Sequence, residues 1–178
     1  STQAMTIAAN PDDKSLILVK DAINERNVQA DSRAVLGQKV SGKIDQESKH
    51  QMALSLQDIF VHENILYYRI LIRNKSSINY DVKSLKFLIR DKKKVKRTSS
   101  QEVEIVPLYV GSKTESVNGY ASRTMIYAVR KFTIPDGKAL HINLFEENGG
   151  RNLRLRIDNK DILKAKMLPV TKNLLTIN

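Results

Sequence analysis

Apolar and polar residues alternate along most of the chain after Met52, which is the pattern of β-strands with one buried face. The alternating positions are Leu66, Tyr68, Ile70 and Ile72; Leu85, Phe87 and Ile89; Val103 and Ile105; Met125, Tyr127 and Val129; Leu140, Ile142 and Leu144; and Leu153, Leu155 and Ile157. Turn sequences separate these runs, among them IPDG at 134–137 and ENGG at 147–150. The spacing predicts seven or eight strands at intervals of about ten residues, which is typical of an antiparallel sandwich.

The first part of the chain has a helical period instead. Asn10 is a suitable N-cap, Pro11 suits the first helical position, and apolar residues then recur every three or four positions, which predicts a helix over residues 11–27. A second, shorter helix is expected over 30–41, interrupted by Gly37. The polar stretch SGKIDQESKHQ at 41–51 is typical of a linker.

These patterns predict a mainly β protein: an immunoglobulin-like antiparallel β-sandwich preceded by a short N-terminal helical arm. We assign residues 1–49 to the helical arm and linker, and residues 50–178 to the β-sandwich domain. The chain has 178 residues, of which 41% are hydrophobic and 28% charged. It is therefore long enough, and apolar enough, for one well-buried core.

The formal net charge of +11 is unevenly distributed. Residues 1–49 hold equal numbers of basic and acidic side chains, so the whole excess lies downstream. The sequence RDKKKVKRTSSQEVE at 90–104 contains the densest basic run. Its basic residues are Arg90, Lys92, Lys93, Lys94, Lys96 and Arg97.

Two interpretations of this run remain open. It lies between two alternating segments, where the exposed end of a β-hairpin is expected, and lysines there oppose aggregation of sheet edges. Alternatively, clustered basic residues bind an anionic partner such as nucleic acid, lipid head groups or an acidic protein face. No aromatic platform for unpaired bases lies nearby, so base-specific recognition is not expected.

Two further groups are candidate interaction residues. Arg151, Arg154 and Arg156 form a second basic stripe, and Arg154 and Arg156 alternate with leucines, so they share the solvent face of one strand. Leu16, Val19 and Ile23 form an apolar stripe on the predicted first helix, which packs on the sandwich or contacts a partner.

The sequence contains no recognisable catalytic or cofactor motif. His50, His62 and His141 lack the spacing of a zinc site, and Glu146 and Glu147 are adjacent strand residues that point to opposite faces. No nucleophile elbow, phosphate-binding loop or dinucleotide fingerprint is present. We therefore expect no enzyme, no cofactor and no metal.

Three other features limit the class of protein. There are no cysteines, which excludes disulfides and zinc–thiolate sites. No apolar run approaches the roughly 18 residues of a membrane helix. No secretory signal pattern is recognisable at the N-terminus.

Several unusual strings occur together and in order: NKSSINYDV at 74–82, RDKKKVKRTSSQE at 90–102, KFTIPD at 131–136 and ENGGR at 147–151. Through them, residues 50–168 resemble the C-terminal domain of the Bacteroides conjugative transposon TraN proteins. Those proteins have an N-terminal β domain behind a signal peptide, and this sequence shows neither. We therefore expect a piece or a shortened relative of such a protein.

The resemblance implies a non-enzymatic structural subunit of a conjugative DNA-transfer apparatus, similar to type IV secretion, in the periplasm or at the outer membrane. Its implied partners are other subunits of the apparatus, including a small outer-membrane lipoprotein. Assembly would use complementary surfaces, strand addition to an exposed edge, or the helical arm. The alternative is a basic accessory protein that contacts DNA phosphates through the 90–97 run and the 151–156 face together.

Overall fold

A computed structural model describes residue 25 and residues 27–93 and 101–169 of the chain. Residues 27–37 are helical, and a second helix, α2, spans Asn159–Leu163. The strands are β1 (Asp45–Lys49), β2 (Met52–His62), β3 (Ile65–Asn74), β4 (Tyr80–Asp91), β5 (Val103–Ile105), β6 (Tyr109–Gly111), β7 (Ser116–Val117), β8 (Ser122–Arg130), β9 (Lys138–Glu146), β10 (Leu153–Ile157) and β11 (Lys166–Met167).

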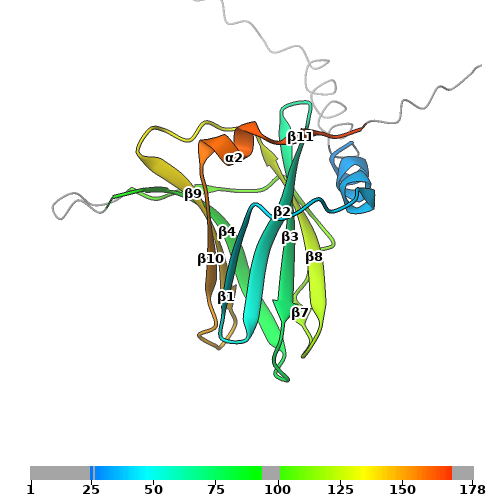
Figure 1. Cartoon of the computed structure of the whole chain (residues 1–178), viewed down its shortest axis with the longest axis vertical. Coiled ribbons are helices and arrows are strands. Elements are labelled where there is room, and N and C mark those ends of the chain that lie inside the picture. Colours follow the sequence, from blue (N-terminus) through cyan, green and yellow to red (C-terminus); the bar gives the residue numbers. More distant parts are fainter. Residues whose placement is uncertain (1–24, 26, 94–100, 170–178) are drawn as a thin grey trace, which may run out of the picture.

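Two sheets pack face to face (Figure 1). The first sheet has the strand order β1-β2-β3-β8-β6, and β11 adds to β2 in parallel. The second sheet has the order β10-β9-β4-β5, and β7 pairs with the start of β4. Apart from β11, neighbouring strands are antiparallel. The predicted fold class, an antiparallel β-sandwich with a helix near its N-terminus, is confirmed.

The main core lies between the sheets and is built from the alternating residues. Tyr68 of β3, Phe87 of β4 and Tyr127 of β8 meet near its centre, with ring centroids 5.1 Å (Tyr68–Phe87) and 5.4 Å (Phe87–Tyr127) apart. All three rings are buried, and burial raises the pKa of the Tyr68 and Tyr127 hydroxyls above its ordinary value. The period-two pattern therefore identifies the inward face of each long strand correctly.

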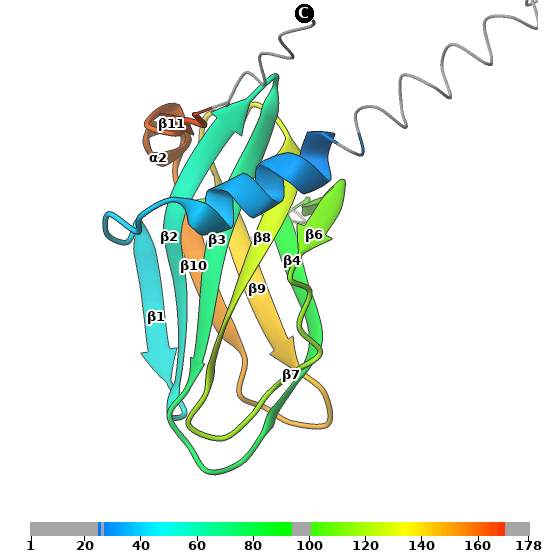
Figure 2. The same cartoon turned by 90° about the vertical axis from the view of Figure 1, so that its right-hand side faces the viewer.

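A second apolar cluster covers the outer face of the first sheet. The helix over 27–37 lies across β2, β3 and β8 in Figure 2 and contributes Val28 and Val35. Gly111 of β6 lets the helix approach closely, because a Cβ at this position would lie 3.2 Å from the Cβ of Ser32. Leu168, just after β11, completes the cluster. Most of β2 is therefore buried on both faces, which explains why apolar residues occupy neighbouring positions such as Ile59 and Phe60.

Side-chain carboxylates connect the two sheets where β1 meets β10. The backbone N–H groups of Arg154 and Arg156 donate to the carboxylates of Glu47 and Asp45, the second over 2.9 Å. Both acidic residues lie on β1, two positions apart, and so match the alternate N–H groups of β10. We call this contact the carboxylate seam. It occupies a sheet edge to which another strand could otherwise add.

The N-terminal part of the structure differs in places from what its sequence predicts. The prediction of a linker over 41–51 is wrong, because residues 45–49 form β1. The expected helix over 30–41 is confirmed in kind, but the structure is helical over 27–37 and Gly37 is the last helical residue. The predicted helix over 11–27, with its stripe of Leu16, Val19 and Ile23, lies almost entirely outside the described residues.

Candidate interaction surface and charged clusters

The basic run begins at the end of β4, which pairs with β5 from Phe87↔Ile105 to Ile89↔Val103 and so forms the hairpin that the alternation predicts. Lys94, Lys96 and Arg97 lie outside the described residues. At the base of the run, Arg90 donates from Nε and Nη2 to Glu102 Oε1 over 2.9 and 2.7 Å. Lys92 Nζ lies 3.7 Å from Asp158 Oδ1. These two basic residues are therefore ion-paired within the domain.

Arg154 and Arg156 point outward from the second sheet, as their alternation predicts. The cross-strand pairs place Arg154 beside Asn143 and Arg156 beside His141 on β9, and these two face Lys86 and Leu88 on β4. Arg90 lies on the same face of β4. We call this surface the basic face. Its members are Lys86, Leu88, Arg90, His141, Asn143, Arg154 and Arg156.

The cations of the basic face surround His141 and affect its ionisation. Burial lowers the pKa of His141 first, and the positive charges of Arg154, Arg90 and Arg156 lower it further. Glu102 acts in the opposite direction but does not reverse the shift. The structure thus brings the two predicted basic groups, represented by Arg90 and by Arg154 with Arg156, to one surface.

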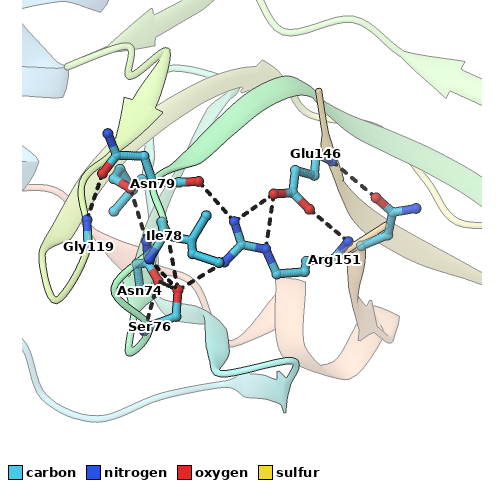
Figure 3. Close-up of polar contacts among 9 residues, drawn as sticks. Asn74, Ser76, Ile78, Asn79, Gly119, Glu146 and Arg151 are labelled. Carbon is cyan, nitrogen blue, oxygen red and sulfur yellow. Dashed lines mark hydrogen bonds and ion pairs between the residues drawn. The ribbon is translucent and has the colours of Figure 1, made fainter. Parts of the chain in front are cut away.

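Arg151 does not belong to that surface. Figure 3 shows it in a clamp with Glu146. Arg151 Nη2 and Nε donate to Glu146 Oε1 over 2.6 and 3.0 Å, and its backbone N–H donates to Oε2 over 2.9 Å. Its guanidinium also lies 5.3 Å from the centre of the Tyr80 ring. Arg151 therefore holds the β9–β10 hairpin against β4.

The loop between β3 and β4 forms the other half of this clamp (Figure 3). Arg151 donates to Ser76 Oγ over 3.1 Å and to the carbonyl oxygen of Asn79 over 2.9 Å. Asn74, which is fully buried, fixes the loop: its Oδ1 accepts from the N–H and hydroxyl of Ser76, and its Nδ2 donates to the carbonyl of Ile78. The hydrogen bonds from Arg151 lower the pKa of Glu146, and its positive charge adds to the effect.

A buried ion pair, missed from the sequence, lies on the outer face of the first sheet. Asp58 and Arg69 are cross-strand neighbours on β2 and β3, and Asp58 Oδ2 lies 2.9 Å from Arg69 Nη2. Both side chains are almost completely buried. A register shift between Leu56 and Asp58 places the carboxylate on this face.

Segments from both ends of the described chain complete this cluster. Arg69 Nη1 donates to the carbonyl of Gln38 over 2.7 Å, and Lys166 Nζ donates to Asp58 Oδ1 over 2.8 Å. Burial raises the pKa of Asp58, but hydrogen bonds from Lys166 and Ser41 and the charge of Arg69 outweigh it, so the pKa is lowered. The pair therefore stays ionised and ties the layers together.

A third polar contact anchors the helix. Asp31 Oδ2 lies 2.6 Å from His62 Nδ1 and accepts from the Tyr67 hydroxyl over 2.8 Å. A cleft of about 420 Å³ adjoins this contact and is lined by helix residues and by the β2–β3 turn. Because burial and the Asp31 carboxylate both disfavour ionisation of Tyr67, its pKa is raised. This contact positions the helix on the sheet.

Metal-binding clusters and membrane-spanning helices are absent from the described residues. In residues 27–93 and 101–169 no group of three or more His, Cys, Asp or Glu side chains is arranged to hold a metal ion. Within the same ranges no helix combines the length and apolar character needed to cross a membrane.

Comparisons with known proteins identify the family. No curated protein matches the chain. A similar solved structure is the "X-ray structure of Northeast Structural Genomics Consortium target SoR45", with 15% sequence identity, 76% of this chain and 86% of that chain covered, and a TM-score of 0.29, a likeness too low to carry an argument. The family model described as "Domain of unknown function (DUF4138)" matches residues 18–167, and the chain therefore belongs to this family, which is found in conjugative transposon TraN-like proteins.

Proposed function

We propose that this chain is a non-enzymatic structural subunit of a conjugative DNA-transfer apparatus, similar to type IV secretion, in the cell envelope. The observation that carries the proposal is the family match over residues 18–167, because this family is found in conjugative transposon TraN-like proteins. The subunit acts by binding other subunits of the apparatus in the periplasm or at the outer membrane, where a small lipoprotein is one candidate partner.

The proposal is supported by the buried ion pairs, which hold distant segments of the domain together. Asp58 with Arg69, and Glu146 with Arg151, connect segments that are distant in the sequence. Such clusters keep the strands and loops in one arrangement, because breaking a buried pair leaves a charge without a partner. A domain of fixed shape is suited to present surfaces to other subunits.

The test is co-purification from cells that carry a conjugative element encoding this protein. The tagged full-length protein is expressed at native level, and the envelope fraction is treated with nuclease before purification. We expect other subunits encoded by the element to co-purify after this treatment. Recovery of the protein alone, or only together with nuclease-sensitive material in the soluble fraction, would contradict the proposal.

A second candidate function is contact with DNA phosphates during transfer. It is favoured by one observation: Arg90, Arg154 and Arg156 lie on the same face of the second sheet. Phosphate binding releases counterions, so affinity for a DNA duplex should fall steeply between about 50 and 200 mM salt. A salt titration of binding to unrelated duplexes of one length distinguishes this function, because affinity should be independent of sequence.

A further inference from the structure

The two outer faces of the sandwich are covered to different extents. The helix and the segment around Leu168 cover the first sheet, whereas no described helix or strand lies over the outer face of β4, β9 and β10 (Figures 1 and 2). The basic face is therefore the uncovered sheet surface among the described residues. It is also the surface on which the structure collects positive charge.

The charges of the basic face are only partly compensated. Arg90 is paired with Glu102, and Arg156 Nε lies 3.8 Å from Asp158 Oδ1. Lys86 and Arg154 form no ion pair within the described ranges. They flank Asn143 from opposite sides, since Asn143 pairs with Arg154 on β10 and with Lys86 on β4. Two uncompensated cations thus lie on one cross-strand row.

Polar groups beneath these cations also lack partners. Asn143 is 6% exposed, and its Oδ1 makes no hydrogen bond to any described residue. His141 Nδ1, on the neighbouring row, is likewise buried without a described partner. Buried polar atoms in native proteins are usually hydrogen-bonded, so a group that binds to this face can pair with Asn143 Oδ1 and His141 Nδ1.

We infer that the basic face binds an extended acidic segment of a partner protein. This inference rests on the proposed function and specifies the surface and the partner chemistry for it. Arg154 and Arg156 are two residues apart on a strand, hence about 6.6 Å apart, which is also the spacing of alternate side chains in an extended peptide. Acidic side chains at alternate positions of the partner can therefore meet both arginines.

The surroundings favour a peptide over a nucleic acid. Glu104 lies beside Leu88 at the edge of the face, and Glu102 is next to it in the hairpin. A continuous phosphate chain that crossed the face would be repelled there, whereas a peptide can place a neutral or basic residue at that point. A peptide also brings both donors and acceptors to Asn143, while a phosphate backbone offers acceptors only.

The apolar residues on this side of the sheet also favour a peptide over a nucleic acid. Leu88 is almost buried within the face, and Phe145 lies next to Ser84 further along the same side of the sheet. A partner segment whose acidic residues face Arg154 and Arg156 can place an apolar residue an even number of positions further along, on the same side, and so contact Phe145. Stacking of successive bases would require several exposed aromatic side chains, and the basic face contains none.

The test measures binding of a fluorescein-labelled synthetic peptide in which Glu alternates with Leu and Ser, by anisotropy at physiological ionic strength. A single-stranded oligothymidine of the same charge is the competing probe. Lys86→Glu with Arg154→Glu should weaken peptide binding by about tenfold or more. Lys75→Glu with Arg123→Glu, an equal charge change at exposed residues outside the basic face, should alter the dissociation constant by less than about twofold.

The remaining outcomes overturn the inference. If both double variants weaken binding equally, the attraction depends on net charge and not on this face. If the oligothymidine binds more tightly than the peptide, and K86E/R154E removes that binding, the ligand is nucleic acid. If neither probe binds, the face has no such role.

A second variant, Lys86→Gln with Arg154→Gln, controls for misfolding of the charge-reversed protein. It should weaken peptide binding several-fold.

Failure of this inference can be distinguished from failure of the proposed function. If the subunits still co-purify with the K86E/R154E variant from the envelope, the assembly role stands and uses another surface. If the peptide binds at the basic face but no subunit co-purifies, the binding surface is real and the proposed function is wrong.

Discussion

Arg151 connects three parts of the chain through one side chain: the β9–β10 hairpin, the β3–β4 loop and the buried ring of Tyr80. We predict that Arg151→Ala lowers the free energy of unfolding by about 2–4 kcal/mol, because Glu146 then loses a charged partner at a site with little solvent. Urea denaturation measures the loss. Arg154→Ala, on an exposed face, is the matched control and should change stability by less than about 0.5 kcal/mol.

The same clamp makes stability depend on pH. The pKa of Glu146 is lowered in the folded state, so ionised Glu146 stabilises the fold above its ordinary pKa of 4.5, and this stabilisation is lost as the pH falls through the folded pKa. The difference in unfolding free energy between the wild type and Glu146→Gln should therefore be largest near pH 7 and shrink towards pH 3. A difference that stays constant over this range would contradict the assignment.

The pair of Asp58 and Arg69 should behave as a coupled unit. Asp58→Ala is expected to cost about 3–5 kcal/mol, because the guanidinium of Arg69 remains buried without its partner. Replacing both residues, as in Asp58→Leu with Arg69→Met, should cost much less than the sum of the single replacements. A double-mutant cycle by chemical denaturation measures the coupling, and additive losses would contradict it.

At the scale of the elements, the carboxylate seam makes a separate prediction. Asp45→Ala with Glu47→Ala removes the acceptors for the Arg154 and Arg156 N–H groups and exposes the β10 edge. We expect a loss of about 1–3 kcal/mol and concentration-dependent association through the freed edge.

Light scattering coupled to size-exclusion chromatography detects this association. Ser48→Ala, on the same strand, is the control and should leave the protein unchanged in size. A D45A/E47A variant that keeps the wild-type size and stability at all concentrations would show that the seam does not protect the edge.

The long strands could be predicted because each has one face in the main core and therefore alternates in polarity. β1 could not, because its sequence DQESK contains no apolar residue, and it is held by pairing with β2 and by the seam. The sequence predicts one helix that ends at residue 27 and another that begins at residue 30, but residues 27–37 are continuously helical. The buried stripe of this helix consists of Val28, Ser32 and Val35, and the serine in its centre hides the helical period.

Among the candidate interaction residues, too, those on an alternating strand could be predicted, whereas those held by contacts between distant segments could not. Alternation placed Arg154 and Arg156 on a solvent face, and the structure confirms this orientation. The clamp of Arg151 could not be predicted, because its partners Ser76 and Asn79 come from a loop distant in the sequence. The ion pair of Asp58 and Arg69 depends on a bulge in β2, for which the sequence gives no signal.

For the whole molecule, the net charge of +11 should destabilise the folded state through repulsion among the basic groups. Raising the ionic strength from about 10 to about 150 mM shortens the screening length from about 30 to about 8 Å. We expect the thermal midpoint to rise by about 2–4 °C. Calorimetry in sodium chloride tests this, with an equal osmolality of a neutral solute as the control, and a falling midpoint would mean that attractive ion pairs dominate.

The described chain enters and leaves the sandwich on one face, since Val28 and Leu168 belong to the same apolar cluster outside the first sheet. A pulling force between these two points would act on that cluster and on the two-residue pairing of β11 with β2, not across the main core. Under tension the helix and β11 would therefore peel away before either sheet is sheared. The domain would lengthen while its opposite face, formed by β4, β9 and β10, remains folded.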